Sequence, residues 1–362
     1  MVWTILPATE RLRVAMISTP WVAVPPPRYG GTELVVSELV NGLVQRGHEV
    51  VLFATGDSRA PCQVRWRYPT PVWPPDPWTE LAHAAWAVEE ILSSPHPFDV
   101  VHSHVPASLG FARFLAEVPV VYTLHHDRDE RLARLYAASG DDVHFVAISR
   151  RQASLFPELR TRAVIHHGLA PEAYPFGPRG RGYLAFLGRF ARVKGPDIAI
   201  EVAGRLGRTL YMGGRPHDEG DGFHLYIEKM LSRPHVRALG ELSHGPKVEL
   251  LQGADALLFP IRWEEPFGLV MIEAMFCGCP VVAFRGGAVE EVVEDGVTGF
   301  LADDPEHMAA LVREAVPRLD RRVVRARAVE RFSSARMVDE HVLLYAAAIG
   351  ERRAPRAEAA SR

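Results

Sequence analysis

Two carboxylates lie eight residues apart in the segment RWEEPFGLVMIEAMF, at Glu265 and Glu273. The apolar run ADALLFP (254–260) predicts a buried strand before them, and the run that begins at Leu269 predicts a helix. The free backbone N–H groups at a helix start bind anions such as phosphate. Two acidic residues beside such a site suggest hydrogen bonds to hydroxyl groups next to phosphates, as in a nucleotide sugar. The alternative is that Glu265 caps the helix and that Glu273 is exposed.

A basic pair follows another apolar run. Arg189 and Lys194 lie just after YLAFLG (183–188), in the sequence GRFARVKGP. A planar guanidinium and a compact ammonium together suit a pyrophosphate group. The alternative is an ordinary solvated loop, since Arg192 shows that basic residues are common in this segment.

Gly30 and Gly31 lie between the proline run 25–27 and the expected helix ELVVSELVNGLVQR, with Thr32 as the expected N-cap. Glycine permits a close approach of backbone to ligand, and the helix start adds a favourable dipole for an anion. A flexible turn is the alternative.

Histidines end two expected strands: His102 and His104 end DVVHSH, and His125 and His126 end VPVVYTLHH. Neighbouring parallel strands would bring some of them together, so a metal site is one interpretation. No known metal-ligand spacing links them, which favours the absence of a metal. Side chains alternate along a strand, so we expect at most one of His125 and His126 to face a ligand.

The sequence Asp127-Arg128-Asp129 resembles the Asp-x-Asp pattern that holds a metal in another class of sugar transferases. It also precedes an expected helix at 129–138, where an acidic residue caps the first turn. Capping is the favoured interpretation. The stretch RDERLARLYAASG carries Arg128, Arg131 and Arg134 beside apolar residues, so it is also a candidate for contact with an anionic bilayer, with an ordinary amphipathic surface helix as the alternative.

Short apolar runs alternate with helical segments along the whole chain, which predicts parallel sheets covered on both faces. The expected strands lie at 13–19, 49–55, 99–104, 118–126 and 144–149, then at 183–188, 209–214, 254–260 and beyond. The Gly-, Pro- and Arg-rich stretch 170–182 between the two series is typical of an interdomain linker. We therefore expect two doubly wound α/β domains, with ligands at the carboxyl ends of their strands.

Composition excludes several classes of protein. The chain has 362 residues, of which 48% are hydrophobic and 23% charged, values that exclude wholesale disorder and fibrous folds. A net charge of −3 gives no reason to expect a nucleic-acid partner. Three cysteines cannot build a secreted disulfide framework. No apolar run reaches the ~18 residues of a membrane span, and the N-terminus lacks the pattern of a signal peptide, so a cytoplasmic location is expected.

The motifs YGGTE (29–33), VHSH, YTLHH, GRFARVK and EEPFGLVMIEA together resemble the retaining glycosyltransferases of family 4. The resemblance spans about residues 12 to 345, and Glu265 and Glu273 match the E-x7-E signature. It implies the GT-B fold: two Rossmann-like domains that face each other across a cleft. The implied boundaries are an N-terminal acceptor-binding domain at 1–169, a C-terminal donor-binding domain at 170–332, a final helix near 333–350 that returns to the first domain, and a disordered tail at 353–362. The glycine loop is similar to that of actinobacterial members, including some that decorate antibiotics.

The resemblance also implies roles for individual residues. Arg189 and Lys194 would neutralise the donor pyrophosphate, and Gly31, next to Gly30, would let its loop close over the phosphates. His125 matches the family histidine near the reacting sugar. The remaining implied contacts are Glu265 to hexose hydroxyls, the N–H groups of Phe267, Gly268 and Leu269 to sugar and phosphate, and Glu273 to the ribose. Ser149 and His166-His167-Gly168 match the crossing between domains, where Asn-Gly is more usual.

The implied activity is metal-independent transfer of a hexose from a nucleoside-diphosphate sugar, with retention, to a hydroxyl of a glycan, a lipid-linked molecule or a natural product. No cofactor is implied, and peripheral contact with the inner face of a membrane is a further expectation. A nucleotide-sugar epimerase of the same fold and a non-catalytic nucleotide-sugar-binding protein are the alternatives. Base, sugar, acceptor, linkage and oligomeric state are left open by the sequence.

Overall fold

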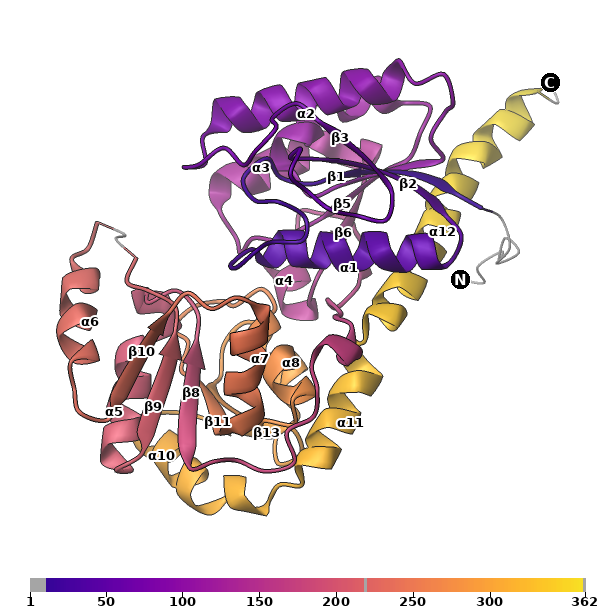
Figure 1. Cartoon of the computed structure of the whole chain (residues 1–362). Coiled ribbons are helices and arrows are strands. Elements are labelled where there is room, and N and C mark those ends of the chain that lie inside the picture. Colours follow the sequence, from indigo (N-terminus) through magenta and orange to yellow (C-terminus); the bar gives the residue numbers. More distant parts are fainter. Residues whose placement is uncertain (1–10, 218–219, 361–362) are drawn as a thin grey trace. The chain divides into compact units, whose positions relative to one another are not determined.

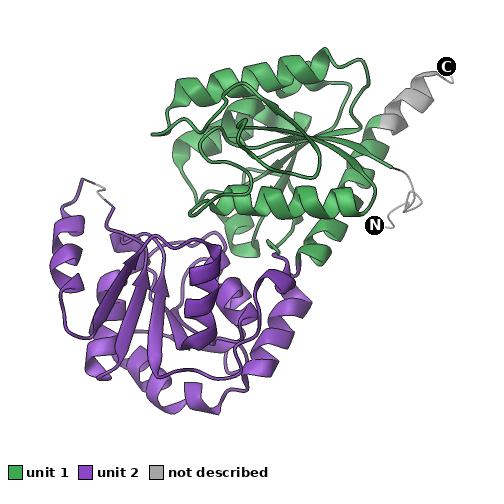
Figure 2. Cartoon of the chain, viewed as in Figure 1, with its two compact units in different colours: residues 1–168, 334–362 green, residues 169–333 purple. Residues whose placement is uncertain are grey.

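The computed structural model describes residues 11–217 and 220–360, with side chains as far as Arg352. The chain divides into two compact units (Figure 2). Unit 1 comprises Met1–Gly168 and Ser334–Arg362, and unit 2 comprises Leu169–Ser333. The first division therefore falls between residues 168 and 169, one residue before the boundary that the sequence predicts.

Unit 1 is built on a seven-stranded parallel sheet with the order β3-β2-β1-β4-β5-β6-β7. Its strands are β1 (Arg13–Ile17), β2 (Glu49–Ala54), β3 (Gln63–Trp66), β4 (Val100–Ser103), β5 (Val120–Thr123), β6 (Val143–Ala147) and β7 (Thr161–Val164). The inner strands are almost wholly buried, as their continuous apolar runs predict. The two edge strands, β3 and β7, are partly exposed and have no continuous apolar run, so the search for such runs misses them.

Helices cover both faces of this sheet, with α1 and α2 on opposite sides (Figure 1). They are α1 (Gly31–Gln45), α2 (Pro77–Leu92), α3 (Glu130–Ser139), α4 (Arg150–Leu155) and α12 (Ser334–Ala360), with 3-10 helices η1 (Pro106–Leu115) and η2 (Gly140–Asp142). The segment that follows β4 thus forms a 3-10 helix rather than an α-helix. The expected N-cap of α1 is also wrong, because the helix begins one residue before Thr32 and its cap is Gly30.

The final helix, α12, packs on unit 1. Its Val338 lies against Gly42 of α1, where an added Cβ would come within 2.4 Å of a valine methyl group. Arg46 of α1 also pairs with Asp339 at 2.7 Å. The helix runs to Ala360, and the disorder expected for residues 353–362 stays a prediction. Residues 361–362 lie outside the described part of the chain.

Unit 2 repeats the plan with a six-stranded parallel sheet of order β10-β9-β8-β11-β12-β13. Its strands are β8 (Tyr183–Leu187), β9 (Thr209–Gly213), β10 (Val236–Gly240), β11 (Ala254–Phe259), β12 (Val281–Phe284) and β13 (Gly299–Ala302). The topology therefore matches the first six strands of unit 1. In both units the direction of winding reverses between two central strands, β1 and β4 in unit 1 and β8 and β11 in unit 2. Such a switch point is where doubly wound sheets bind ligands.

The helices of unit 2 form two layers. On one side α5 (Pro196–Arg205) packs against α6 (Phe223–Leu231) and α10 (Pro305–Glu314), and on the other α8 (Leu269–Phe276) packs against α7 (His244–Gly253) and α11 (Arg321–Phe332). The short helices are α9 (Val289–Val292), η3 (Pro171–Ala173), η4 (Arg192–Lys194) and η5 (Val316–Arg318).

The stretch 170–182 is not a free linker. It belongs to unit 2, where an added Cβ at Gly177 would come within 2.3 Å of the Gln252 carbonyl oxygen. Arg325 of α11 also donates to the Pro171 carbonyl oxygen at 3.1 Å. Composition suggested a linker because these Gly and Pro residues resemble one, but close backbone packing holds the segment in place. Among the described residues, no helix is long and apolar enough to cross a membrane.

Candidate functional site

Two of the expected site residues meet at the switch point of unit 2. Lys194 lies in the loop after β8 and Glu265 in the loop after β11, and Lys194 Nζ lies 2.5 Å from Glu265 Oε2. The side chains are 16% and 8% exposed, so the pair is largely shielded from solvent. A buried charge of either sign is costly without its partner, so each of the two side chains keeps the other charged and in place.

Trp263 completes this pair. Its indole Nε1 donates to Glu265 Oε2 at 3.0 Å, and its ring lies 4.5 Å from Lys194 Nζ, within range of a cation–π interaction. Both the ammonium and the indole therefore contact the same carboxylate oxygen, Oε2.

The backbone of Glu265 is fixed by a glycine. Gly287 has φ +54°, and a Cβ there would lie 2.2 Å from both the nitrogen and the carbonyl oxygen of Glu265. The Glu265 carbonyl also accepts from the Ala288 N–H at 2.8 Å. The loop after β12 therefore presses on the Glu265 backbone, and only glycine fits at that point.

Glu273 has a similar environment on α8. It is 4% exposed, and its Oε1 accepts from the Tyr174 hydroxyl at 2.9 Å and pairs with the Lys247 ammonium. Each glutamate of the E-x7-E segment thus holds one lysine and one aromatic hydrogen-bond donor on a single oxygen. The alternative interpretation of this segment is wrong: Glu273 is buried, and the N-cap of α8 is Gly268, without a side-chain cap.

The start of α8 carries the three expected backbone donors. Phe267 is buried, and Gly268 and Leu269 are half-buried. No side-chain hydrogen bond caps the start of this helix. Arg189 lies directly after β8 and is half-buried, whereas Arg192 is drawn outward by an ion pair with Asp221 at 2.9 Å.

In unit 1, the expected glycine loop ends at the start of α1. A Cβ at Gly30 would lie 2.7 Å from Pro26 Cβ and 3.0 Å from the Glu33 carboxylate, whereas Gly31 is exposed. Glu33 is buried and accepts from the Thr19 hydroxyl, and burial raises the pKa of its carboxyl. The proline run and α1 are thus packed closely around Gly30.

His125 belongs to a cluster of five histidines at the switch point of unit 1. Its Nε2 lies 2.7 Å from His104 Nδ1, and its ring stacks on that of His167 at 5.4 Å. The rings of His102 and His341 continue the cluster, 4.4 Å from His104 and 5.3 Å from His102 respectively. Burial lowers the pKa of His125 to about 3 and that of His341 to about 4. These rings are therefore neutral at pH 7.

The cluster does not have the geometry of a metal centre: over the described ranges, no group of three or more His, Cys, Asp or Glu side chains could hold a metal ion. His126 is exposed, in line with the alternation of side chains along the strand. Asp129 accepts from the N–H groups of Arg131 and Leu132, so it caps α3 as expected. Ser149 likewise caps α4 through the Gln152 N–H, and Arg336 of α12 donates to the His166 carbonyl oxygen at 2.6 Å.

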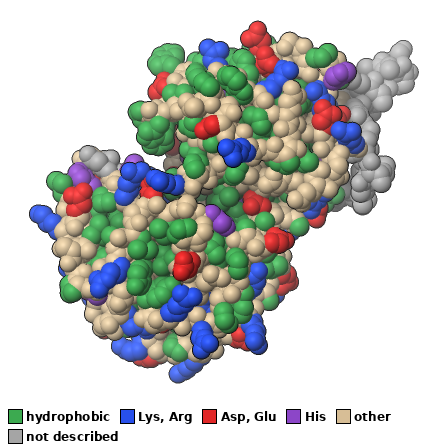
Figure 3. Space-filling model, viewed as in Figure 1, with side chains coloured by type: hydrophobic (Ala, Val, Ile, Leu, Met, Phe, Trp, Pro, Cys, Tyr) green, Lys and Arg blue, Asp and Glu red, His purple; other side chains and the backbone are tan. Residues whose placement is uncertain are grey.

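Helix α3 offers little apolar surface to a membrane. Its Ala133 and Tyr136 are buried, and Leu132 and Leu135 pack against the same core. Basic and acidic side chains are interspersed over the face of the molecule drawn in Figure 3.

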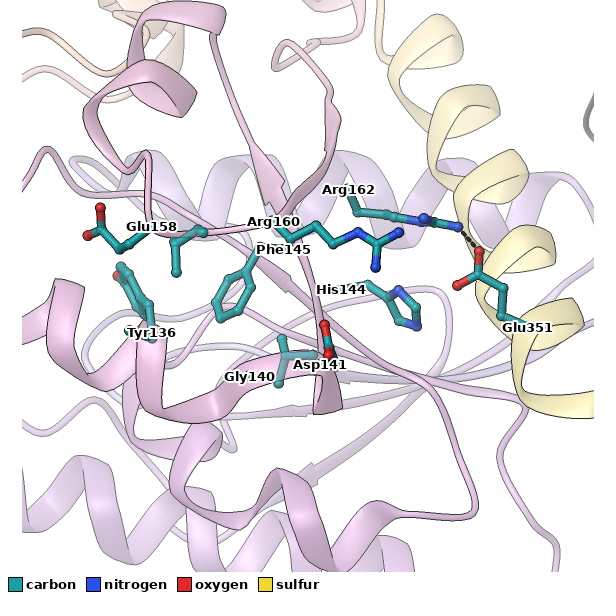
Figure 4. Close-up of a pocket in the computed structure, with 12 residues that line it drawn as sticks. Tyr136, Gly140, Asp141, His144, Phe145, Glu158, Arg160, Arg162 and Glu351 are labelled. Atoms are coloured by element: carbon teal, nitrogen blue, oxygen red, sulfur yellow. Dashed lines mark ion pairs between the residues drawn. The ribbon is translucent and has the colours of Figure 1, made fainter. Parts of the chain in front are cut away.

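A cavity of about 230 Å³ lies at the opposite edge of the unit 1 sheet, where β6 and β7 begin. Arg162 points across it to Glu351 of α12, with which it forms an ion pair (Figure 4). Arg160, Asp141 and Glu158 also line the cavity. The cavity is lined by side chains of both charges, and it lies at the opposite ends of the strands from His125.

Comparison with known proteins shows the family of the chain. The family described as "Glycosyl transferases group 1" matches residues 177–323, and that described as "Glycosyltransferase Family 4" matches residues 29–131. A D-inositol 3-phosphate glycosyltransferase of Mycolicibacterium smegmatis is 28% identical over 92% of this chain and 90% of its own. The chain belongs to glycosyltransferase family 4 and has the GT-B fold.

Solved structures of other proteins show the same architecture. AviGT4, a glycosyltransferase involved in avilamycin A biosynthesis, is 25% identical with a TM-score of 0.74, over 94% of this chain and 98% of its own. HepE of Anabaena, solved with UDP and glucose, has a TM-score of 0.70 at 19% identity, over 91% of this chain and 98% of its own, and supports the fold. This chain is therefore a glycosyltransferase.

Three contact residues were outside the motifs: Trp263, Tyr174 and Lys247. Trp263 lies two residues before Glu265, so the motif itself could have indicated it. Tyr174 was hidden in the supposed linker, and Lys247 lies in α7 rather than at a strand end. No local pattern links either residue to Glu273, because α7, the segment after η3 and α8 come together only in the folded unit.

Proposed function

We propose that this glycosyltransferase moves a hexose from a nucleoside-diphosphate sugar to an acceptor hydroxyl with retention and without a metal ion. The Lys194–Glu265 pair at the switch point of unit 2 carries this proposal. It places a cation suited to a pyrophosphate beside a carboxylate suited to sugar hydroxyls.

The donor contacts follow from atoms that the structure leaves to a ligand. Lys194 has three N–H donors, so it can keep one on Glu265 and direct others to phosphate oxygens. Trp263 and Lys194 both occupy Oε2 of Glu265, so we assign Oε1 to hexose hydroxyls. By the same argument, Tyr174 and Lys247 occupy Oε1 of Glu273, and Oε2 accepts from the ribose.

Positive charge replaces the metal in this proposal. When the bond from the anomeric carbon to the diphosphate breaks, negative charge develops on the leaving oxygen. Fixed charges and dipoles stabilise that oxygen: the side chains of Lys194 and Arg189 and the N–H groups at the start of α8. Such preorganised electrostatic stabilisation is usually the largest contribution to catalysis. The acceptor oxygen then bonds to the same face of the sugar, and its proton passes to the diphosphate.

Unit 1 is proposed to bind the acceptor, with His125 contacting a substrate hydroxyl. The loop after β3 supports this, because its Val72 N–H donates to the Pro20 carbonyl oxygen at 3.0 Å, at the carboxyl edge of the sheet. Trp73 and Trp78 beside it are 68% and 78% exposed. If this surface binds the acceptor, the Trp73→Ala and Trp78→Ala variants raise the acceptor KM and leave the donor KM unchanged; unchanged acceptor kinetics would remove this part of the proposal.

The test of the reaction is transfer with UDP-, GDP-, ADP- and TDP-sugars in excess EDTA, with the anomeric proton of the product followed by NMR. We expect transfer from one donor in EDTA, with the anomeric configuration of the donor retained. Inverted product would refute retention, and activity that returns only with a divalent cation would refute metal independence.

A further inference from the structure

The strongest feature that the donor chemistry does not use is the hydrogen-bonded line Met16–His104–His125 at the switch point of unit 1. His104 Nε2 lies 3.3 Å from Met16 Sδ, and His104 Nδ1 lies 2.7 Å from His125 Nε2. Met16 is a fully buried residue of β1, and His104 follows β4, the neighbouring strand. The His104 backbone is also tied to β1, because its N–H donates to the Ile17 carbonyl oxygen at 3.0 Å.

The chemistry of sulfur decides which nitrogens carry protons. A thioether accepts a hydrogen bond and has none to donate. The hydrogen between Met16 and His104 therefore resides on His104 Nε2. Because a neutral imidazole has only one N–H, His104 Nδ1 is then an acceptor, and the hydrogen in the second bond must come from His125 Nε2. His125 is left with Nδ1 as its acceptor nitrogen.

Both rings are neutral, as this assignment requires. Burial is the main cause that lowers the pKa of His104 well below 6.5, and it lowers that of His125 to about 3. Two other rings of the cluster, His102 and His341, bond to atoms outside this line. His102 has its own partners, the Tyr345 hydroxyl at Nδ1 (2.6 Å) and the Thr123 hydroxyl at Nε2 (2.8 Å), and His341 Nδ1 donates to the Met337 carbonyl oxygen at 2.8 Å.

We propose that Met16 and His104 are positioning residues that hold His125 in its Nε2–H tautomer, so that His125 Nδ1 accepts a hydrogen bond from a substrate hydroxyl. This inference rests on the proposed function in one respect, the contact between His125 and substrate. The tautomer itself does not depend on that contact. The opposite tautomer would present an N–H to the substrate and would leave two lone pairs facing each other between His104 and His125.

The first measurement is a long-range ¹H–¹⁵N NMR spectrum of ¹⁵N-histidine-labelled protein at pH 7, which separates protonated from unprotonated ring nitrogens. The His125 signals are those that disappear in a His125→Gln variant. We expect Nε2 to be protonated and Nδ1 unprotonated in His125, and Nε2 to be protonated in His104. Protonation of His125 at Nδ1 would overturn the inference, whether or not the protein transfers sugar.

Two substitutions then test the cause. Met16→Leu keeps the shape of the buried side chain and removes the sulfur acceptor. We expect it to mix the tautomers of His104 and His125 and to lower kcat about 5-fold, the effect of roughly one hydrogen bond, with little change in the donor KM. Unchanged ring-nitrogen signals and an unchanged kcat would overturn the role of Met16.

The His104→Asn variant tests whether His104 acts through its hydrogen bond to His125 or through its size. His104→Leu removes the acceptor for His125, and we expect a fall in kcat of about 10-fold. In His104→Asn the side-chain oxygen takes the place of Nδ1, so a large part of that loss should be recovered and the His125 signals should return to the Nε2–H pattern. Equal losses for Leu and Asn would show a merely structural role. Absence of transfer by the unsubstituted protein with every donor would refute the proposed function instead, and the spectra would still decide the tautomer.

Discussion

The two units wind their sheets in the same order, yet they fill the switch point with different chemistry. In unit 2 the loops after β8 and β11 meet through a charged pair, Lys194 and Glu265, and the Trp263 indole donates to the Glu265 carboxylate. In unit 1 the switch point holds neutral rings, with His104 between Met16 and His125. The fold thus supplies a position for a ligand in both units, and the side chains decide which ligand it is.

The contrast matches what each half of the proposed reaction needs. A diphosphate carries negative charge that grows as it leaves, so its unit needs fixed cations and helix N–H groups. A hydroxyl group is uncharged and needs an oriented hydrogen-bond acceptor. Neutral imidazoles provide one without a competing positive charge.

The largest effect should come from the charged switch point. Glu265→Gln leaves Lys194 without its counter-charge and weakens the contact to sugar hydroxyls, so we expect kcat to fall about 100-fold or more in transfer assays. Glu290→Gln is the control, because that carboxylate is exposed and pairs only weakly with Arg285 at 3.5 Å. Comparable losses in both variants would contradict a special role for Glu265.

A backbone change in unit 2 should have a smaller but still large effect. Gly287→Ala would place a Cβ 2.2 Å from the Glu265 backbone, so the loop must shift and move the carboxylate. We expect kcat to fall roughly 10- to 100-fold, since small misplacements of positioning groups cost about 100-fold. Gly296→Ala is the matched control, because Gly296 has a similarly positive φ of +76° and no atom within 4 Å of the added Cβ. If both variants lost activity equally, backbone strain rather than the Glu265 contact would be the cause.

Acid should act mainly on unit 1. Buried histidines there have lowered pKa values, about 3 for His125 and about 4 for His83 and His341. Below pH ~6.5 these histidines bind protons in the unfolded chain but not in the folded unit. Their contribution to the free energy of unfolding is therefore complete above pH ~6.5 and is lost as the pH falls towards 4.

Hydrogen exchange at pH 7 and pH 5, corrected for the intrinsic rates, provides the measurement. We expect the protection of unit 1 strands to fall by about 10-fold or more, and that of unit 2 strands to fall less. An equal loss in the two units would show that the histidine cluster does not set the acid sensitivity.

The smallest effect concerns the second glutamate of unit 2. Tyr174→Phe removes the hydroxyl that donates to Glu273 and leaves Lys247 in place. We expect the donor KM to rise about 5-fold, the effect of one hydrogen bond, with kcat little changed. Tyr226→Phe, at a side chain that is 52% exposed, is the control. A fall in kcat at constant KM would place Glu273 in the chemical step rather than in binding.

Most strands of the fold could be predicted from the sequence, because continuous apolar runs mark buried parallel strands. The sequence also indicated Lys194 and Glu265, which lie in loops that follow such strands, and Glu273, which lies eight residues after Glu265 in the predicted helix. It missed β3 and β7, whose partly exposed residues carry no such run. It also treated the segment around Tyr174 as a linker, since the packing that brings it to Glu273 involves residues about 100 positions away.

The histidines show the same limit. Their place at the ends of β4 and β5 was visible in the sequence, but His167 and His341 come from other parts of the chain. The tautomer assignment depends on the sulfur of Met16. In the sequence, a methionine of a buried strand cannot be distinguished from an ordinary core residue.

Hydrogen exchange with and without a nucleoside diphosphate in EDTA tests whether unit 2 holds the donor site. We expect one of UDP, GDP, ADP or TDP to protect residues 187–196 and 260–276, and we expect this protection to be lost in Glu273→Gln. Protection confined to unit 1, or protection that requires a divalent cation, would contradict the assignment of a metal-independent donor site to unit 2.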